Sequence, residues 1–118
     1  MGEALHAPLH IHLDKHNVVQ PDIVAFTEPN RRFMTEAGVR HPPDLVVEIL
    51  PPQDRSRDLV RKRLLYAKFG IDEYWIIDPK LETIDVNVLE GEHYAERSAA
   101  DGVARSLIFP GLVVDPRQ

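Results

Sequence analysis

The chain has 118 residues, of which 43% are hydrophobic, and a formal net charge of −5 at pH 7. This size suits one buried core, so we expect a single domain over residues 1–118, and the absence of cysteine excludes disulfides, thiolate metal sites and cysteine nucleophiles. No stretch approaches the ~20 apolar residues of a membrane span and the first residues lack a signal-peptide pattern, so we expect a cytoplasmic location.

The beginning of the chain predicts a β-hairpin. Apolar and polar residues alternate over residues 5–13, which is typical of a strand with one buried face. A polar turn follows at residues 14–17. Residues 18–20 and 23–26 then predict a second strand that is entered through Pro21. The two strands should pair with each other.

The middle of the chain predicts a loop and then a central strand. Residues 28–43 are bounded by proline and mixed in charge, which indicates a loop with a helical turn near residues 33–37. Residues 44–50 form a run rich in β-branched side chains that ends at Pro51. Glu48 is the one charge inside this apolar run.

The second half predicts one helix and several strands. Ser56 can cap a helix that runs to Phe69 and stops at Gly70. Residues 73–77 and 83–89 then predict two paired strands, and residues 86–89, with the apolar tail, could offer an edge for a homodimer. The tail predicts short strands at 94–96 and 106–108. The fold class that follows is α/β (α+β), with one main helix after the third strand.

The buried position expected for Glu48 points to a site. A carboxylate in an apolar strand is costly unless it is paired, hydrogen-bonded or bound to a metal, although an exposed edge position would also explain it. If the second and third strands are antiparallel, Asp22 lies close to Glu48, and Asp44 lies at the far end. Two carboxylates with open positions suit Mg²⁺ or Mn²⁺.

The helix carries a possible partner for these carboxylates. Asp58, Lys62 and Tyr66 recur every four residues, so they share one face that can turn toward Glu48. Alternatively, Asp58 and Lys62 form an ordinary surface ion pair with Tyr66 packed beside them. Further basic residues flank this face and could meet phosphates: Arg55, Arg57, Arg61, Arg63 and Lys68.

The sequence resembles a known family at these positions. The signature comprises Pro-Asp-Leu-Val-Val-Glu-Ile-Leu at 43–50, then Asp58, Lys62, Tyr66 and Gly70, and Glu-Tyr-Trp-Ile-Ile-Asp-Pro at 73–79. It is similar to that of the Uma-two family of putative restriction endonucleases, in the PD-(D/E)xK nuclease superfamily. The resemblance implies a restriction-endonuclease-like mixed β-sheet, DNA as substrate, and Mg²⁺ or Mn²⁺ held by Asp22 and Glu48. It also implies a catalytic Lys62, supported by Asp58 and Tyr66.

Two departures from the family pattern favour an alternative function. The superfamily usually has its lysine two positions after the acidic residue, but here that position is Leu50, so the resemblance implies that Lys62 takes the role. The family also usually begins with a helical segment carrying a further glutamate, and we expect that support to be missing because the sequence opens on the predicted first strand. The alternative is a weakly active or inactive nuclease-fold protein that serves as a binding or assembly module.

Overall fold

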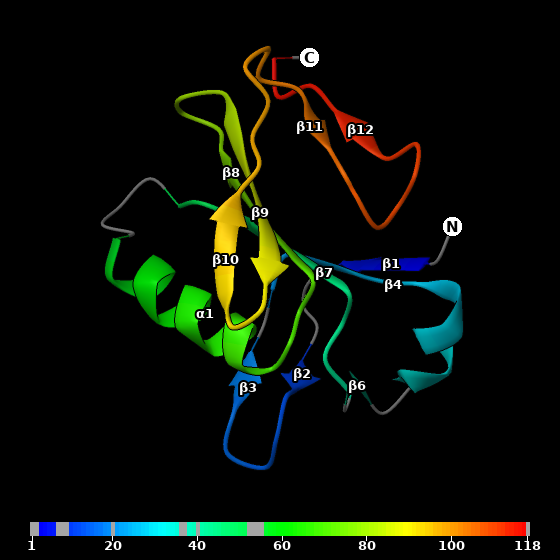
Figure 1. The fold of residues 1–118 in the computed structure, drawn as a ribbon. Coiled ribbons are helices and arrows are strands. Elements are labelled where there is room, and N and C mark those ends of the chain that lie inside the picture. The colour runs from blue at the N-terminus through cyan, green and yellow to red at the C-terminus, as the bar shows by residue number, and fades with distance from the viewer. Residues whose placement is uncertain are drawn as a thin grey trace.

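A six-stranded mixed sheet with one helix against one face organises the protein, as the computed structural model shows (Figure 1). The structure describes residues 3–6, 10–19, 21–35, 38–39, 41–51 and 56–117, and the side chains of these except residues 3–6, 31, 33–35, 38–39 and 56–58. The predicted mixed α+β architecture is therefore confirmed.

The strand order of the main sheet is β1-β4-β7-β8-β9-β10. Neighbouring strands are antiparallel except β7 and β8, which are parallel because helix α1 forms the crossover between them. The predicted central strand, helix and following strand pair are confirmed. The strands are β1 (Glu3–His6), β4 (Ile23–Phe26), β7 (Leu45–Ile49), β8 (Glu73–Asp78), β9 (Thr83–Glu90) and β10 (His93–Glu96), and α1 is Ser56–Lys68.

Two smaller sheets and a 3-10 helix complete the described elements. The small sheets have the orders β3-β2-β6-β5 and β11-β12. Their strands are β2 (Ile11–His12), β3 (Val18–Val19), β5 (Met34–Thr35), β6 (Gly38–Val39), β11 (Ala104–Arg105) and β12 (Val113–Val114), and the 3-10 helix η1 is Glu28–Phe33.

The first hairpin forms, but it is divided between two sheets. β1 pairs with β4 in the main sheet, whereas β2 pairs with β3 in a small one. The prediction of one continuous strand over residues 5–13 was therefore wrong, with residues 7–9 outside the described part. Pro21 stands between β3 and β4, and proline lacks the N–H that a continuous ladder needs.

The helical turn of the loop lies earlier than predicted. It spans η1, and strand β5 begins at Met34, while residues 36–37 lie outside the described part. Asp44 explains the shift, because its carboxylate accepts hydrogen bonds from the backbone N–H of Thr27 (2.7 Å) and from Asn30 Nδ2 (2.9 Å). These contacts hold the chain in a helical turn immediately after β4.

The tail segment 106–108 is a turn rather than the predicted strand. Its polar groups bind a buried carboxylate: Ser106 Oγ (2.8 Å), Leu107 N (3.2 Å) and Ile108 N (2.9 Å) all donate to Glu73 Oε2. Because Glu73 takes these N–H groups, they are not available to a β-ladder.

The apolar core lies on both faces of the main sheet. On the face that α1 covers, Tyr66 packs with Val46, Tyr74 and Tyr94. On the opposite face, the segment carrying β11 and β12 packs over Trp75, which is 2% exposed. The cluster around Trp75 comprises Ala25, Leu45, Val47, Trp75, Ile84, Val86, Ala104 and Phe109.

The prediction that residues 86–89 form a free strand edge was wrong, because β9 lies between β8 and β10. Within the described residues, the outer strands of the main sheet are β1 and β10, and homodimerisation stays a prediction. None of the helices that the structure describes is long and apolar enough to cross a membrane.

Removing the charge of Glu73 should loosen the C-terminal segment. Glu73 is fully buried, so Glu73→Gln forfeits several charge-assisted hydrogen bonds that solvent cannot replace. We expect the free energy of unfolding, measured by urea denaturation, to fall by about 2–4 kcal/mol. The matched change at exposed Glu92, Glu92→Gln, should have almost no effect, and equal losses in both variants would contradict the assignment.

Candidate active site

The carboxylate of Glu48 is the centre of the candidate site. Lys62 Nζ lies 2.6 Å from Glu48 Oε2, and the Tyr66 hydroxyl donates a hydrogen bond of 3.0 Å to the same oxygen. Glu48 is 5% exposed and sits in a central strand. An exposed edge position is therefore excluded, and the charge is buried with partners.

The connection from β7 through α1 brings these partners to the sheet. β7 and β8 are parallel, so the chain must return along the face of the sheet between them, and α1 makes that return. Lys62 and Tyr66 are four residues apart and thus on one side of α1. Their contacts show that this side faces Glu48, while the side chain of Asp58 lies outside the described part.

Asp22 lies beside Glu48 on the neighbouring strand. The antiparallel register pairs Ile23 with Val47, which places the preceding Asp22 opposite Glu48. Asp22 Oδ2 accepts a hydrogen bond of 2.7 Å from the backbone N–H of Ile49. Both carboxylates thus reach one end of the β4–β7 pair.

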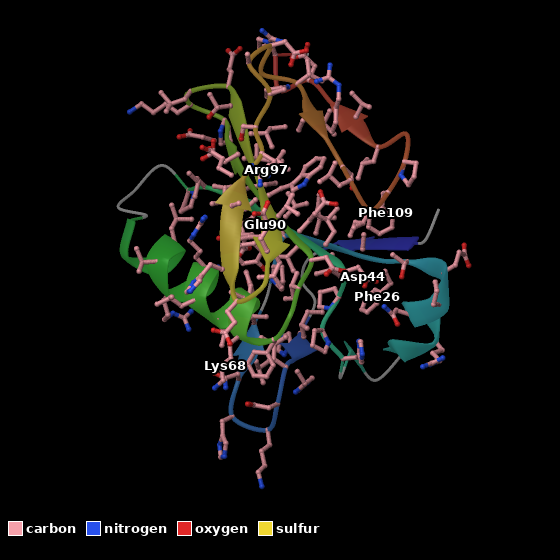
Figure 2. All side chains as sticks on the ribbon, viewed as in Figure 1. Phe26, Asp44, Lys68, Glu90, Arg97 and Phe109 are labelled. Atoms are coloured by element: carbon pink, nitrogen blue, oxygen red, sulfur yellow. The ribbon has the colours of Figure 1, made fainter. Side chains whose placement is uncertain are left out.

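Asp44 lies at the other end of β7 and serves the loop after β4. In Figure 2 it appears beside Phe26, close to η1. Its oxygens bind Thr27 and Asn30, as described above, so this carboxylate is engaged by the fold. The two Pro-Asp pairs of the sequence therefore have different surroundings, and Asp22 is the one next to Glu48.

Opposing effects act on the pKa of Glu48, and those that raise it outweigh those that lower it. Burial raises the pKa of the Glu48 carboxyl above its usual value, and the nearby charge of Asp22 raises it further. Lys62 and Tyr66 oppose this by stabilising the ionised form. The ionised form of Glu48 is therefore less favourable than in water, and an additional positive charge beside it would stabilise that form.

The donor set fits a hard divalent cation that keeps several water ligands. Both Glu48 contacts go to Oε2, and the Asp22 contact goes to Oδ2, so within the described residues Glu48 Oε1 and Asp22 Oδ1 have no protein partner. Two carboxylates with open oxygens match Mg²⁺ or Mn²⁺. Among the described residues, no group of three or more His, Asp or Glu side chains is arranged to hold a metal ion, so water and substrate would have to supply the remaining ligands.

Arg63, one of the basic residues expected to meet phosphates, is engaged elsewhere. Its guanidinium donates to Asn87 Oδ1 (2.7 Å) and to the backbone oxygen of Tyr94 (2.9 Å). Helical spacing distributes the basic residues around α1, and no sequence pattern indicates that Asn87 accepts a hydrogen bond from one of them. Arg61 and Lys68 are exposed, and Arg55 and the side chain of Arg57 lie outside the described part.

Comparisons with known proteins agree on fold and family. The model of the family Uma2, described as "Putative restriction endonuclease", matches residues 1–117. Four chains of solved structures are similar, among them "a putative nuclease belonging to DUF820 from Anabaena variabilis ATCC 29413". That likeness has a TM-score of 0.73 and 21% identity, and covers 98% of this chain but 66% of the other. No curated protein matches.

Removing Lys62 should expose the cost of the buried charge. Lys62→Met leaves the buried Glu48 carboxyl without its cation, and we expect the free energy of unfolding at pH 7 to fall by about 3 kcal/mol. The double variant Glu48→Gln/Lys62→Met should recover to within about 1 kcal/mol of the parent, because it buries no unpaired charge. Urea denaturation measures both, with Lys68→Met at the exposed end of α1 as the control.

The deficit of Lys62→Met should also depend on pH. Burial raises the folded-state pKa of Glu48, and Lys62→Met removes the ammonium that lowers it, so this pKa rises further in the variant. The folded variant therefore gains more stability than the parent as the pH falls through that pKa. The deficit should therefore shrink between pH 7 and about pH 5. A deficit independent of pH would contradict an unpaired Glu48 as its cause.

Proposed function

The chain belongs to the Uma2 family of putative restriction endonucleases, and from this premise we propose that it is a metal-dependent endonuclease that hydrolyses DNA phosphodiester bonds. The observation that carries the proposal is the buried Glu48 carboxylate, contacted by Lys62 and Tyr66, with Asp22 on the adjacent strand. Structural packing alone does not require two carboxylates at one place beside a lysine.

In this proposal Asp22 and Glu48 hold Mg²⁺ or Mn²⁺ through their open oxygens. When bound, the ion would polarise the phosphodiester and lower the pKa of a bound water. The backbone N–H of Ile49 orients Asp22, and Tyr66 orients Glu48. The protein therefore holds both carboxylates before substrate arrives, which reduces the reorganisation needed during reaction.

Lys62 is the proposed catalytic cation. Its ammonium can orient the attacking water or stabilise the negative charge that develops on the phosphate oxygens. The attack forms a new P–O bond from water, breaks the bond to the leaving sugar oxygen, and moves one proton from the water to that oxygen through the solvent. The helix supplies the lysine that the superfamily usually places two residues after the acidic residue of the strand.

Cleavage of supercoiled plasmid and single-stranded DNA with Mg²⁺ or Mn²⁺ tests the proposal. We expect activity in the parent and losses of at least ~100-fold in Asp22→Ala, Glu48→Ala and Lys62→Ala. Asp72→Asn is the matched control, because Asp72 lies before the start of β8, away from Glu48. Circular dichroism would show that the variants remain folded.

The opposite result has a clear meaning. If the folded parent cleaves neither DNA and calorimetry detects no Mn²⁺ binding, the nuclease proposal fails. The alternative, a nuclease-fold binding or assembly module, would then be the better explanation. Cleavage that survives in all three variants would instead place the active site elsewhere.

Tyr66→Phe tests the orienting role of the hydroxyl. The change removes the hydrogen bond to Glu48 Oε2 but keeps the buried ring, so we expect cleavage to slow about tenfold, equivalent to ~1.4 kcal/mol. Thr27→Val is the control, since the Thr27 hydroxyl donates to Asp44 Oδ2 at 3.1 Å and not to Glu48. Equal slowing in both variants would contradict a specific role for Tyr66.

A further inference from the structure

Two aliphatic side chains of the helix that carries Lys62 are exposed. Val60 is 63% exposed and Leu64 is 66% exposed, so two of its aliphatic side chains contribute little burial. Tyr66 is fully buried, while Leu65 and Ala67 are packed only in part. Because burial of apolar surface usually fixes a helix on a sheet, polar contacts must carry a larger share here.

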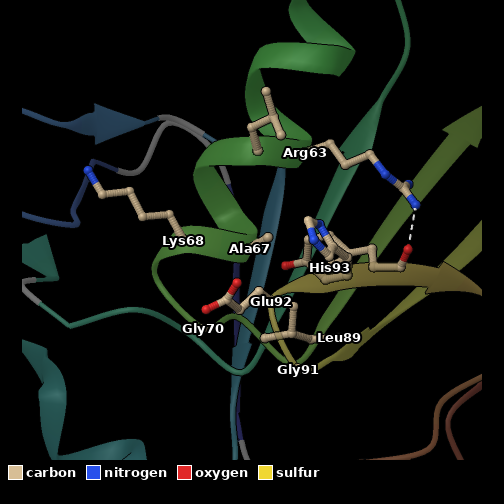
Figure 3. A pocket seen from close by; sticks show the side chains of 10 residues that line it. Arg63, Ala67, Lys68, Gly70, Leu89, Gly91, Glu92 and His93 are labelled. Atoms are coloured by element: carbon tan, nitrogen blue, oxygen red, sulfur yellow. Dashed lines mark hydrogen bonds between the residues drawn. The ribbon is translucent and has the colours of Figure 1, made fainter.

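Arg63 makes the polar contacts on the side of α1 next to the β9–β10 hairpin. Figure 3 shows its side chain reaching from the helix to the backbone of β10. Its two terminal nitrogens bind different strands, one at Asn87 in β9 and one at Tyr94 in β10. The guanidinium carbon also lies 5.7 Å from the centre of the Tyr94 ring.

The groups that receive Arg63 are themselves fixed. Asn87 is 2% exposed, and its Nδ2 donates to the backbone oxygen of Tyr74 at 3.1 Å. Tyr94 is held by its hydroxyl, which donates to the backbone oxygen of Ile71. The Tyr74 ring in turn meets the Tyr66 ring edge-on, with 5.0 Å between centroids. Arg63 thus binds a rigid part of the sheet that adjoins the candidate site.

We propose that Arg63 is a positioning residue, whose two-stranded contact fixes α1 on the sheet so that Lys62 lies on Glu48. Lys62 and Arg63 are consecutive and point about 100° apart around the helix, so together they resist both rotation and sliding of α1. The fork geometry of the guanidinium matters, because it presents two separate nitrogens to the two strands, whereas a lysine has a single terminal nitrogen. An effect of Arg63 on catalysis rests on the proposed function, whereas its effect on the position of Lys62 does not.

Nuclear magnetic resonance of the Lys62 ammonium tests the proposal without requiring cleavage. An ammonium held against a buried carboxylate exchanges its protons slowly with water, and its ¹⁵N-labelled signal reports that contact. We expect Arg63→Lys, which keeps the charge but loses the fork, to accelerate this exchange at least ~10-fold while the domain remains folded. Arg63→Gln should behave alike, and Arg61→Gln, which removes the same charge from an exposed site of α1, should behave as the parent.

Three results would overturn the proposal. Unchanged exchange in folded Arg63→Lys would mean that the fork is not needed, and equal acceleration in Arg61→Gln would mean that charge alone acts. Unfolding of Arg63→Lys would mean that Arg63 supports the whole domain. If the parent cleaves DNA, Arg63→Lys should lower kcat with little change in KM. An inactive parent with the expected exchange pattern would refute the nuclease and leave the positioning role intact.

Discussion

The burial of one ionised carboxylate in the centre of the sheet constrains much of this structure. Glu48 is almost inaccessible to solvent, and an unpaired charge at such a place would cost several kcal/mol. The compensation comes from Lys62 and Tyr66, which lie on a helix rather than on a neighbouring strand. The position and rotation of α1 are therefore tied to Glu48. The parallel pairing of β7 and β8 follows from the same arrangement, because α1 is the crossover that joins them.

The opposite face of the sheet shows how a buried carboxylate is treated when it has a structural task. Glu73 accepts hydrogen bonds on both oxygens, from Trp75 Nε1 on one and from the 106–108 turn on the other. At Glu48 the protein engages one oxygen and leaves the other without a partner among the described residues. A fully bonded carboxylate pins a loop, whereas a half-bonded one beside a second carboxylate keeps capacity for a ligand. Glu48 and Glu73 are both buried, so what distinguishes them is the number of carboxylate oxygens that accept hydrogen bonds.

The parts of the fold that depend on local pattern could be predicted from the sequence, and those that depend on distant hydrogen bonds could not. The central strand, α1 and the β8–β9 pair follow from apolar periodicity and from Gly70 at the helix end, where φ is +74°. The 106–108 turn depends on Glu73, more than thirty residues away, so its apolar residues suggested a strand instead. For the site, four-residue spacing indicated that Lys62 and Tyr66 share a face. The partner of Arg63 could not be inferred, because Asn87 looks like any polar residue of an alternating strand.

A lysine on a helix is held near its acidic partner by different forces from a lysine on the same strand as that partner. Two residues on one strand are held at a fixed separation by the backbone itself, since alternate side chains point to the same face. Lys62 has no such support, so its distance from Glu48 depends on how α1 packs, and α1 leaves Val60 and Leu64 exposed. Further polar contacts must then hold the helix in place. Arg63 supplies such contacts, because it donates hydrogen bonds to Asn87 in β9 and to Tyr94 in β10. The Lys62–Glu48 contact therefore depends on a precisely anchored helix, and thus on residues that touch neither of the two side chains.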